Sequence, residues 1–170
     1  ATVVALERVG STLYAGGHFT TLGGQTRARL AAMDGVTGAL RPGFTGWADA
    51  AVRTLLASPD GTSIAVGGEF TSLSGQSRTY IGAIDQNGVA TSWRPPVPCV
   101  DALLPCYLYD LTQDADTVYA GVGGPGGRVT AYSRSSGSIR WDTTGDGDVQ
   151  GLAPAASLNF ALARLRWQVC

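Results

Sequence analysis

Short apolar runs separated by turn residues make up most of the chain. The runs are rich in β-branched and aromatic residues, and only the tail from Ala153 to Val169 could accommodate a helix. The separators include Pro59-Asp60-Gly61 and Asn87-Gly88, whose Gly and Asn residues accept the positive φ angles of tight turns. The pattern therefore predicts an all-β chain of short antiparallel strands.

One block of sequence recurs along the chain. Residues 13–34 align with residues 64–85 at a single offset of 51 (67 − 16 = 51). A third copy begins near Val118 and lacks two of the shared elements, and a fourth begins at Val149 and then loses the pattern. The aligned pairs are Gly16 and Gly67, Phe19 and Phe70, Gln25 and Gln76, Arg27 and Arg78, and Asp34 and Asp85. We therefore expect one domain, 1–170, with repeat units at 3–48, 52–95, 107–145 and a degenerate 149–170.

Four strand segments can be read in each of the first two units. They are residues 3–6, 13–17, 30–34 and 40–44 in the first unit, and 52–55, 64–68, 81–85 and 89–93 in the second. Four short antiparallel strands in a repeat of about 40–50 residues are typical of a β-propeller blade. The chain would then hold about three and a half blades, fewer than the four to eight of a closed ring. A β-sandwich needs no repeat and does not explain the offset.

The residues of the repeat also carry a family resemblance. The order is Gly-Gly-x-Phe-Thr, then Gly-Gln-x-Arg, then Leu/Ile-x-Ala-x-Asp, with Ser-Pro-Asp-Gly-Thr between units. This order resembles the bacterial delta-60 repeat β-propellers, distant relatives of kelch and WD-repeat propellers. The resemblance implies part of a larger exported or cell-surface protein, often beside carbohydrate-binding modules. It brings no catalytic residues with it.

Composition excludes several kinds of chemistry. The net charge is −1 without a basic stripe, so DNA and RNA are not expected partners. The chain has no Lys and a single His, which excludes lysine nucleophiles and a His-rich metal site. No apolar run is long enough to span a membrane. Because the chain starts in mid-pattern, we expect a processed segment that further blades of the same polypeptide or a homo-oligomer complete.

Cysteine spacing suggests a disulfide. Cys99 and Cys106 flank a stretch that interrupts the repeat, and a short-range bridge between them would fit a secreted protein. Cys170 is the odd cysteine, either free or paired to another chain.

Four residues at repeated positions are candidate ligand contacts. Arg27 and Arg78 could bind carboxylates or sugar hydroxyls, although they could equally bond to the loop backbone or pair with Asp34 and Asp85. His18 and Glu69 occupy the variable slot of the Gly-Gly-x-Phe-Thr element, where specificity could vary on a common scaffold. A solvated strand residue is the alternative for both.

An acidic cluster and the tryptophans complete the candidates. Asp142, Asp146 and Asp148 could hold Ca²⁺ through carboxylate oxygens, although they depart from an EF-hand loop and a turn role is the alternative. Trp47 lies in a loop and is the best candidate for an exposed stacking platform. Trp93 and Trp141 share a strand position, so we expect them in the core.

Three hypotheses for function follow. The first is a non-catalytic binding propeller of a secreted or cell-surface protein that recognises a glycan or a protein, with no cofactor other than the calcium just considered. The second is a carbohydrate-active enzyme with its site at the propeller mouth. The third is a structural assembly module. The sequence leaves activity open and favours binding, since fold analogy alone does not supply function.

Overall fold

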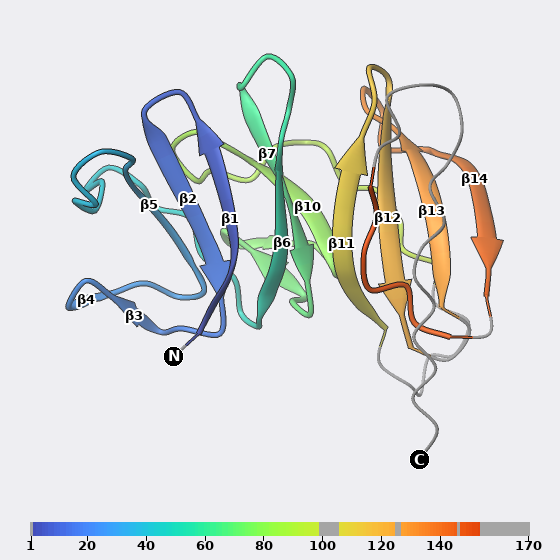
Figure 1. Ribbon diagram of the computed structural model, residues 1–170, viewed down its shortest axis with the longest axis horizontal. Helices are drawn as coiled ribbons and strands as arrows, with labels where there is room; N and C mark the ends of the chain where they lie inside the picture. The colour runs from blue at the N-terminus through green and yellow to red at the C-terminus, as the bar shows by residue number, and fades with distance from the viewer. Residues whose placement is uncertain (1, 99–105, 125–126, 146, 154–170) are drawn as a thin grey trace.

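The computed structural model describes residues 2–98, 106–124, 127–145 and 147–153, and this part of the chain is all-β, without a helix. Its strands form three main antiparallel sheets that stand side by side in chain order (Figure 1). The first sheet, of order β1-β2-β5, contains Val3–Val9, Thr12–Gly17 and Leu30–Asp34. The second, β6-β7-β10, contains Val52–Ala57, Ser63–Gly68 and Ile81–Asp85. The third, β11-β12-β13-β14, contains Tyr107–Gln113, Thr117–Gly123, Arg128–Ser133 and Ile139–Thr144.

The expected fourth strands at 40–44 and 89–93 are wrong. Each segment touches its sheet through one bridge, Met33 with Leu40 and Ile84 with Ala90. Pro42 comes two residues after the first bridge, and proline has no N–H to continue a ladder; in the second unit the last ladder bond runs from the Thr91 N–H to the Ala83 carbonyl oxygen. The chain instead leaves the sheet edge toward the next unit. Only the third sheet has a full fourth strand, β14.

Two short hairpins were not predicted. They pair β3 (Thr21–Leu22) with β4 (Gln25–Thr26), and β8 (Ser72–Leu73) with β9 (Gln76–Ser77). Both fall within the repeated Gly-Gln-x-Arg loops. Gly24 and Gly75 have positive φ angles there, which a tight hairpin turn needs.

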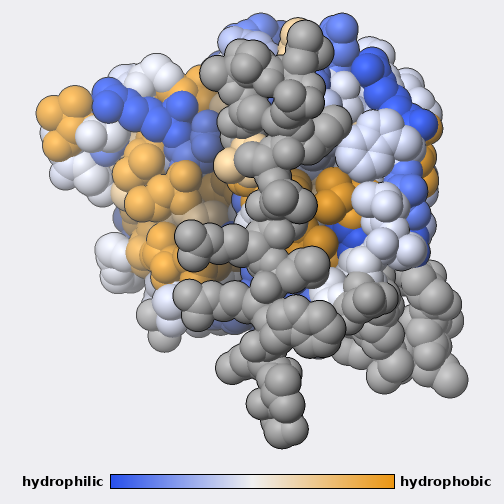
Figure 2. All heavy atoms as spheres, turned by 45° about the vertical axis from the view of Figure 1, so that its right-hand side comes forward, coloured by the Kyte–Doolittle hydropathy of each residue, from blue (hydrophilic) through white to orange (hydrophobic). Residues whose placement is uncertain are grey.

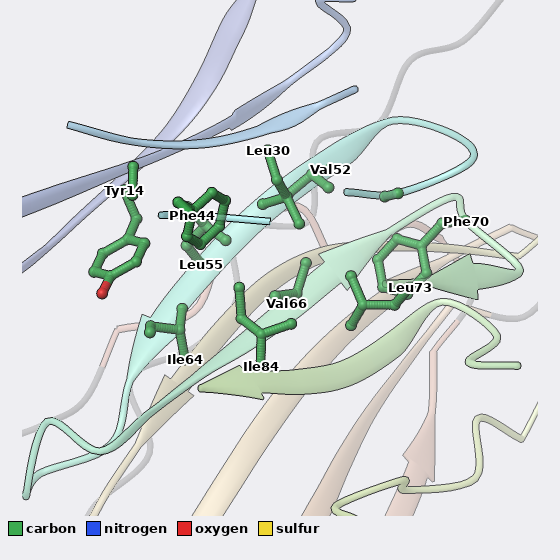
Figure 3. Packing of buried hydrophobic residues seen from close by; sticks show 12 residues of the cluster. Tyr14, Leu30, Phe44, Val52, Leu55, Ile64, Val66, Phe70, Leu73 and Ile84 are labelled. Atoms are coloured by element: carbon green, nitrogen blue, oxygen red, sulfur yellow. The ribbon is translucent and has the colours of Figure 1, made fainter. Parts of the chain in front are cut away.

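The main hydrophobic core lies between the first and second sheets (Figure 3). Tyr14 packs edge-on against Phe44, with ring centroids 5.9 Å apart, and its hydroxyl donates to the Gln86 carbonyl oxygen at 3.2 Å. Phe70, one of the aligned residues of the repeat, is fully buried in this core. A second cluster between the second and third sheets includes Leu108, Leu111 and Tyr132.

Glycines at repeated positions let neighbouring sheets approach closely. A Cβ atom on Gly16 would lie 2.5 Å from Val52 Cγ1, and one on Gly67 would lie 2.3 Å from Leu108 Cδ2. Gly16 in β2 and Gly67 in β7 therefore each accommodate an apolar side chain of the next sheet. Gly121 holds Val149 in the same way, at 2.9 Å, so the chain repeats this contact at the start of the fourth expected unit.

The apolar face at the β1 end of the stack is uncovered. Three leucines share one register position: Leu6 lies opposite Ala15, Leu55 opposite Val66 and Leu111 opposite Ala120. Leu55 and Leu111 are 6% and 5% exposed because a preceding sheet covers them, whereas Leu6 is 59% exposed.

One face of the described part of the molecule carries both hydrophobic and hydrophilic areas (Figure 2). On the face that Figure 2 shows, hydrophobic residues gather into patches rather than spread evenly. Within the described part of the chain, no helix is long and apolar enough to cross a membrane.

Candidate functional site

The first strand of every sheet carries the same irregularity. The pairing register shifts between Val3 and Ala5 in β1, between Val52 and Thr54 in β6, and between Leu108 and Asp110 in β11. The extra residues are Val4, Arg53 and Tyr109. Because a β-bulge redirects a side chain out of the regular alternation, these three positions are where the repeat can vary its surface.

Two of these bulge residues contact each other across neighbouring sheets. The Arg53 guanidinium carbon lies 4.9 Å from the centroid of the Tyr109 ring and 5.7 Å from that of Tyr107. The two tyrosine rings are 6.3 Å apart at an interplanar angle of 69°. The arrangement is a cation–π contact shared by two rings.

Glu69 fixes the orientation of Arg53. Arg53 Nε donates to Glu69 Oε1 at 2.7 Å, and a terminal guanidinium nitrogen forms an ion pair with the same oxygen. Both side chains are about a quarter exposed, at 29% and 24%. We call Arg53, Glu69, Tyr107 and Tyr109 the tyrosine–arginine patch. It offers two aromatic rings, N–H donors and carboxylate acceptors on one partly exposed surface, the combination that polar ligands with an apolar face require.

Carboxylates next to the patch are held by the backbone. Asp148 Oδ1 accepts the Gly124 N–H at 2.8 Å, and Asp110 Oδ2 accepts the Leu152 N–H at 2.7 Å. Burial, followed by the negative charge of Asp148, raises the pKa of Tyr109, so this phenol stays neutral at physiological pH.

The variable slot predicted from sequence adjoins the patch in one unit only. Glu69 belongs to the patch, whereas the His18 side chain is exposed. The backbone N–H of His18 donates to the Thr2 carbonyl oxygen at 2.8 Å. The equivalent Glu69 N–H donates to the Ala51 carbonyl oxygen. The two residues therefore share a backbone position, and the bulge residue beside each differs: Val4 in the first sheet, Arg53 in the second.

The repeated arginines bond to their own loops. Arg27 donates to the Thr26 carbonyl oxygen and to Gln25 Oε1, at 2.8 and 3.1 Å. Arg78 donates to the carbonyl oxygens of Ser77 and Thr91, at 2.8 and 2.7 Å. The backbone alternative is thus the one observed; Asp34 and Asp85 instead accept N–H groups of their own turns.

The acidic cluster is split between different partners. Asp142 forms an ion pair with Arg128 at 2.9 Å and accepts the Thr130 hydroxyl, while Asp148 accepts Gly124 N–H. Asp146 lies outside the described residues. Among the residues that are described, no three acidic, histidine or cysteine side chains are grouped as metal ligands would be. Calcium at this loop stays a prediction.

The tryptophans only partly follow expectation. Trp47 is exposed in its loop, as predicted. Trp93 is half-buried against the second core cluster, and its indole N–H donates to the Ser133 carbonyl oxygen at 3.4 Å. The expected burial of Trp141 is wrong: β14 is an outer strand, and this ring is exposed beside Tyr119, at a centroid distance of 5.9 Å.

Of the predicted disulfide, only one cysteine can be placed. Cys106 is buried just before β11, and Cys99 lies outside the described residues. The bridge therefore stays a prediction.

Sequence reasoning missed three of the four patch residues. Arg53 lies in the segment 52–55, which was assigned to a first strand, and Tyr107 and Tyr109 lie at the start of the third unit. The available signal was that the three units carry unlike residues at one aligned position, Val4, Arg53 and Tyr109.

Comparisons with known proteins identify a fold and no family. No family model matches the chain. No curated protein matches it either. Among solved structures, the chain is similar to the computationally designed Ika8 protein, with a TM-score of 0.63 and 13% sequence identity. The alignment covers 91% of this chain and 41% of the designed one, so this chain spans less than half of that protein's length. At this identity the likeness shows a shared all-β fold alone.

Proposed function

We propose that the chain is a non-catalytic binding module of an exported or cell-surface protein, and that it recognises a glycan at the tyrosine–arginine patch. The observation that carries this proposal is the contact of Arg53 with both tyrosine rings while Glu69 holds its guanidinium. A sugar ring has an apolar face that stacks on tyrosine and vicinal hydroxyls that bind a guanidinium or a carboxylate.

The same proposal interprets the three sheets as blades of a β-propeller of the delta-60 repeat type. Support comes from the recurrence of the bulge, of the glycine contact and of the leucine position in each sheet. In a propeller the first strands of the blades lie nearest the axis, so bulges on β1, β6 and β11 would gather at one central opening.

Binding is favoured over the enzyme alternative because the carboxylates near the patch have protein partners. Glu69 is paired with Arg53, Asp110 accepts from Thr54, Leu111 and Leu152, and Asp148 accepts from Gly124. A glycosidase requires two carboxylates that are available to the scissile bond.

A glycan array tests the proposal. The wild-type chain, Arg53→Ala, Tyr109→Ala and the control Arg8→Ala would be compared on the same array. Arg8 is an exposed arginine of β1 whose Nε donates to the Gly10 carbonyl oxygen, and its removal changes the net charge by as much as Arg53→Ala does. We expect wild type and Arg8→Ala to bind the same glycans and both patch variants to lose them. Binding to a peptide array with a blank glycan array would instead identify a protein ligand.

A specific observation also favours the assembly alternative. The face of the first sheet that carries Leu6 matches the faces that carry Leu55 and Leu111, and both of those are covered by a sheet of the same repeat. We propose that another sheet of this repeat type covers the Leu6 face. This role is compatible with glycan binding, since the patch lies between the second and third sheets.

An exported location implies the Cys99–Cys106 disulfide, because such bridges persist in oxidising compartments. Mass spectrometry of the protein from its natural source, before and after reduction and alkylation, tests this: the bridged peptide should appear only before reduction.

A further inference from the structure

A second pocket, separate from the tyrosine–arginine patch, carries two arginines. It has a volume of about 200 Å³ and is formed by the loop after β9 and the segment that follows the second unit. Arg78 comes from the loop and Arg94 from the segment. The other lining residues contribute hydroxyls, at Ser77 and Thr79, and apolar surface, and none of them is acidic.

Among the described residues, no carboxylate neutralises the charge of these arginines. Within the described residues, the ion pairs are those of Arg53 with Glu69 and of Arg128 with Asp142, so neither pocket arginine has a carboxylate partner. Arg78 is only 9% exposed, and its Nε has no hydrogen-bond partner there. Burying a cation without a counter-charge is costly. Burial, and then repulsion from Arg94, also lowers the pKa of Arg78.

A purely structural role explains Arg78 but not Arg94. Arg27 occupies the equivalent position in the first unit, donates likewise to the carbonyl oxygen of the preceding residue, and also leaves its Nε without a partner among the described residues. The first unit carries Arg41 before Pro42 near the corresponding segment, but the residue that aligns with Arg94 at the offset of 51 is Gly43. Arg94 is therefore specific to the second unit at this aligned position, where it adds positive charge next to Arg78.

We infer that the Arg78–Arg94 pocket binds one small anionic group, a carboxylate or a sulfate, as found on acidic sugars. Arg94 is exposed at the pocket, and Arg78 provides a buried guanidinium that is already oriented by its bonds to Ser77 and Thr91. The hydroxyls of Ser77 and Thr79 are neutral donors of the kind that accompany arginine in anion sites. The rigid Pro95-Pro96 dipeptide fixes the position from which Arg94 extends.

Titration calorimetry with three probes tests this inference. Sodium glucuronate and sodium sulfate carry the two candidate anions, and glucose is the neutral counterpart of glucuronate, all at a constant ionic strength set with sodium chloride. Wild type should bind glucuronate or sulfate saturably, and which of them binds distinguishes the two sources. Glucose should give no heat beyond dilution.

Arg94→Gln is the informative variant, because Arg78 also holds the loop and its removal could unfold the hairpin. We expect Arg94→Gln to weaken anion binding about tenfold or more, and Arg41→Gln, an exposed arginine outside the pocket, to leave it unchanged. No binding of either anion to wild type, or equal binding by wild type and Arg94→Gln, would overturn the inference. Arg53→Ala should bind the anion normally, so failure here is distinct from failure of the glycan proposal.

Discussion

Leu6 and Leu55 occupy the same register position in adjacent sheets, yet Leu6 is ten times as exposed, at 59% against 6%. The difference comes from their neighbours and not from their own strands: the first sheet covers Leu55, and no described residue group covers Leu6 to the same extent. The same residue at the same repeated position therefore contributes differently to the free energy of unfolding. Its contribution depends on whether a preceding sheet covers it.

Truncating these two leucines should separate their contributions. Leu55→Ala creates a cavity between two sheets and should lower the free energy of unfolding by about 2–5 kcal/mol. Leu6→Ala removes an exposed side chain and should change it by less than about 0.5 kcal/mol. Urea denaturation at low protein concentration, where self-association is minimal, measures both. Equal losses would contradict the exposure difference.

Gly68→Ala should be strongly destabilising. A Cβ atom there would lie 2.1 Å from the Ala51 carbonyl oxygen, a backbone atom that cannot move as a side chain can. We expect a loss of about 3 kcal/mol in the free energy of unfolding. Gly43→Ala is the matched control, because nothing lies within 4 Å of its added Cβ, and it should cost under about 0.5 kcal/mol. Comparable thermal midpoints for the two variants would refute this account of the repeated glycines.

Features of the fold that depend on neighbouring residues along the chain can be predicted from the sequence, whereas features that depend on contacts between strands or sheets cannot. The repeat at Gly16 and Gly67 and the turn at Pro59-Asp60-Gly61 follow from local chemistry, and the strands and close contacts expected there are present. The bulges at Arg53 and Tyr109 arise from pairing between strands, which alternation along one strand cannot reveal. Their contact joins residues of two sheets, so the patch could not be predicted without knowing which sheets adjoin.

Glu7 should make stability depend on pH in an unusual direction. Burial raises the pKa of this carboxyl, and a hydrogen bond with the Ala57 backbone offsets the rise only in part. The folded state therefore favours the neutral acid: stability is highest below the unfolded pKa and falls as pH rises through the folded one. Glu7→Gln, which keeps the shape without the charge, should stabilise the chain at about pH 7 and have little effect at about pH 3. Urea denaturation at both pH values measures this, and a destabilised variant at the higher pH would argue against it.

Asp60 should have the opposite dependence. Hydrogen bonds from the Ser58 hydroxyl and from the Thr62 N–H and hydroxyl lower the pKa of Asp60 to about 2. Its contribution to stability is complete above the unfolded pKa of about 3.9 and is lost as pH falls toward about 2. The stability difference between wild type and Asp60→Asn should accordingly shrink across that interval in acid titrations followed by circular dichroism. A difference that stays constant down to the lower pH would show that the carboxylate is not what the turn recognises.

We propose that another sheet of the same repeat type covers the exposed Leu6 face of the first sheet. Light scattering across a range of concentrations, on wild type and on Leu6→Glu, tests this most directly. We predict that the mass of the wild-type chain rises above that of one chain with concentration, and that Leu6→Glu stays at the mass of one chain. A wild-type chain that remains a stable monomer at every concentration would contradict the claim.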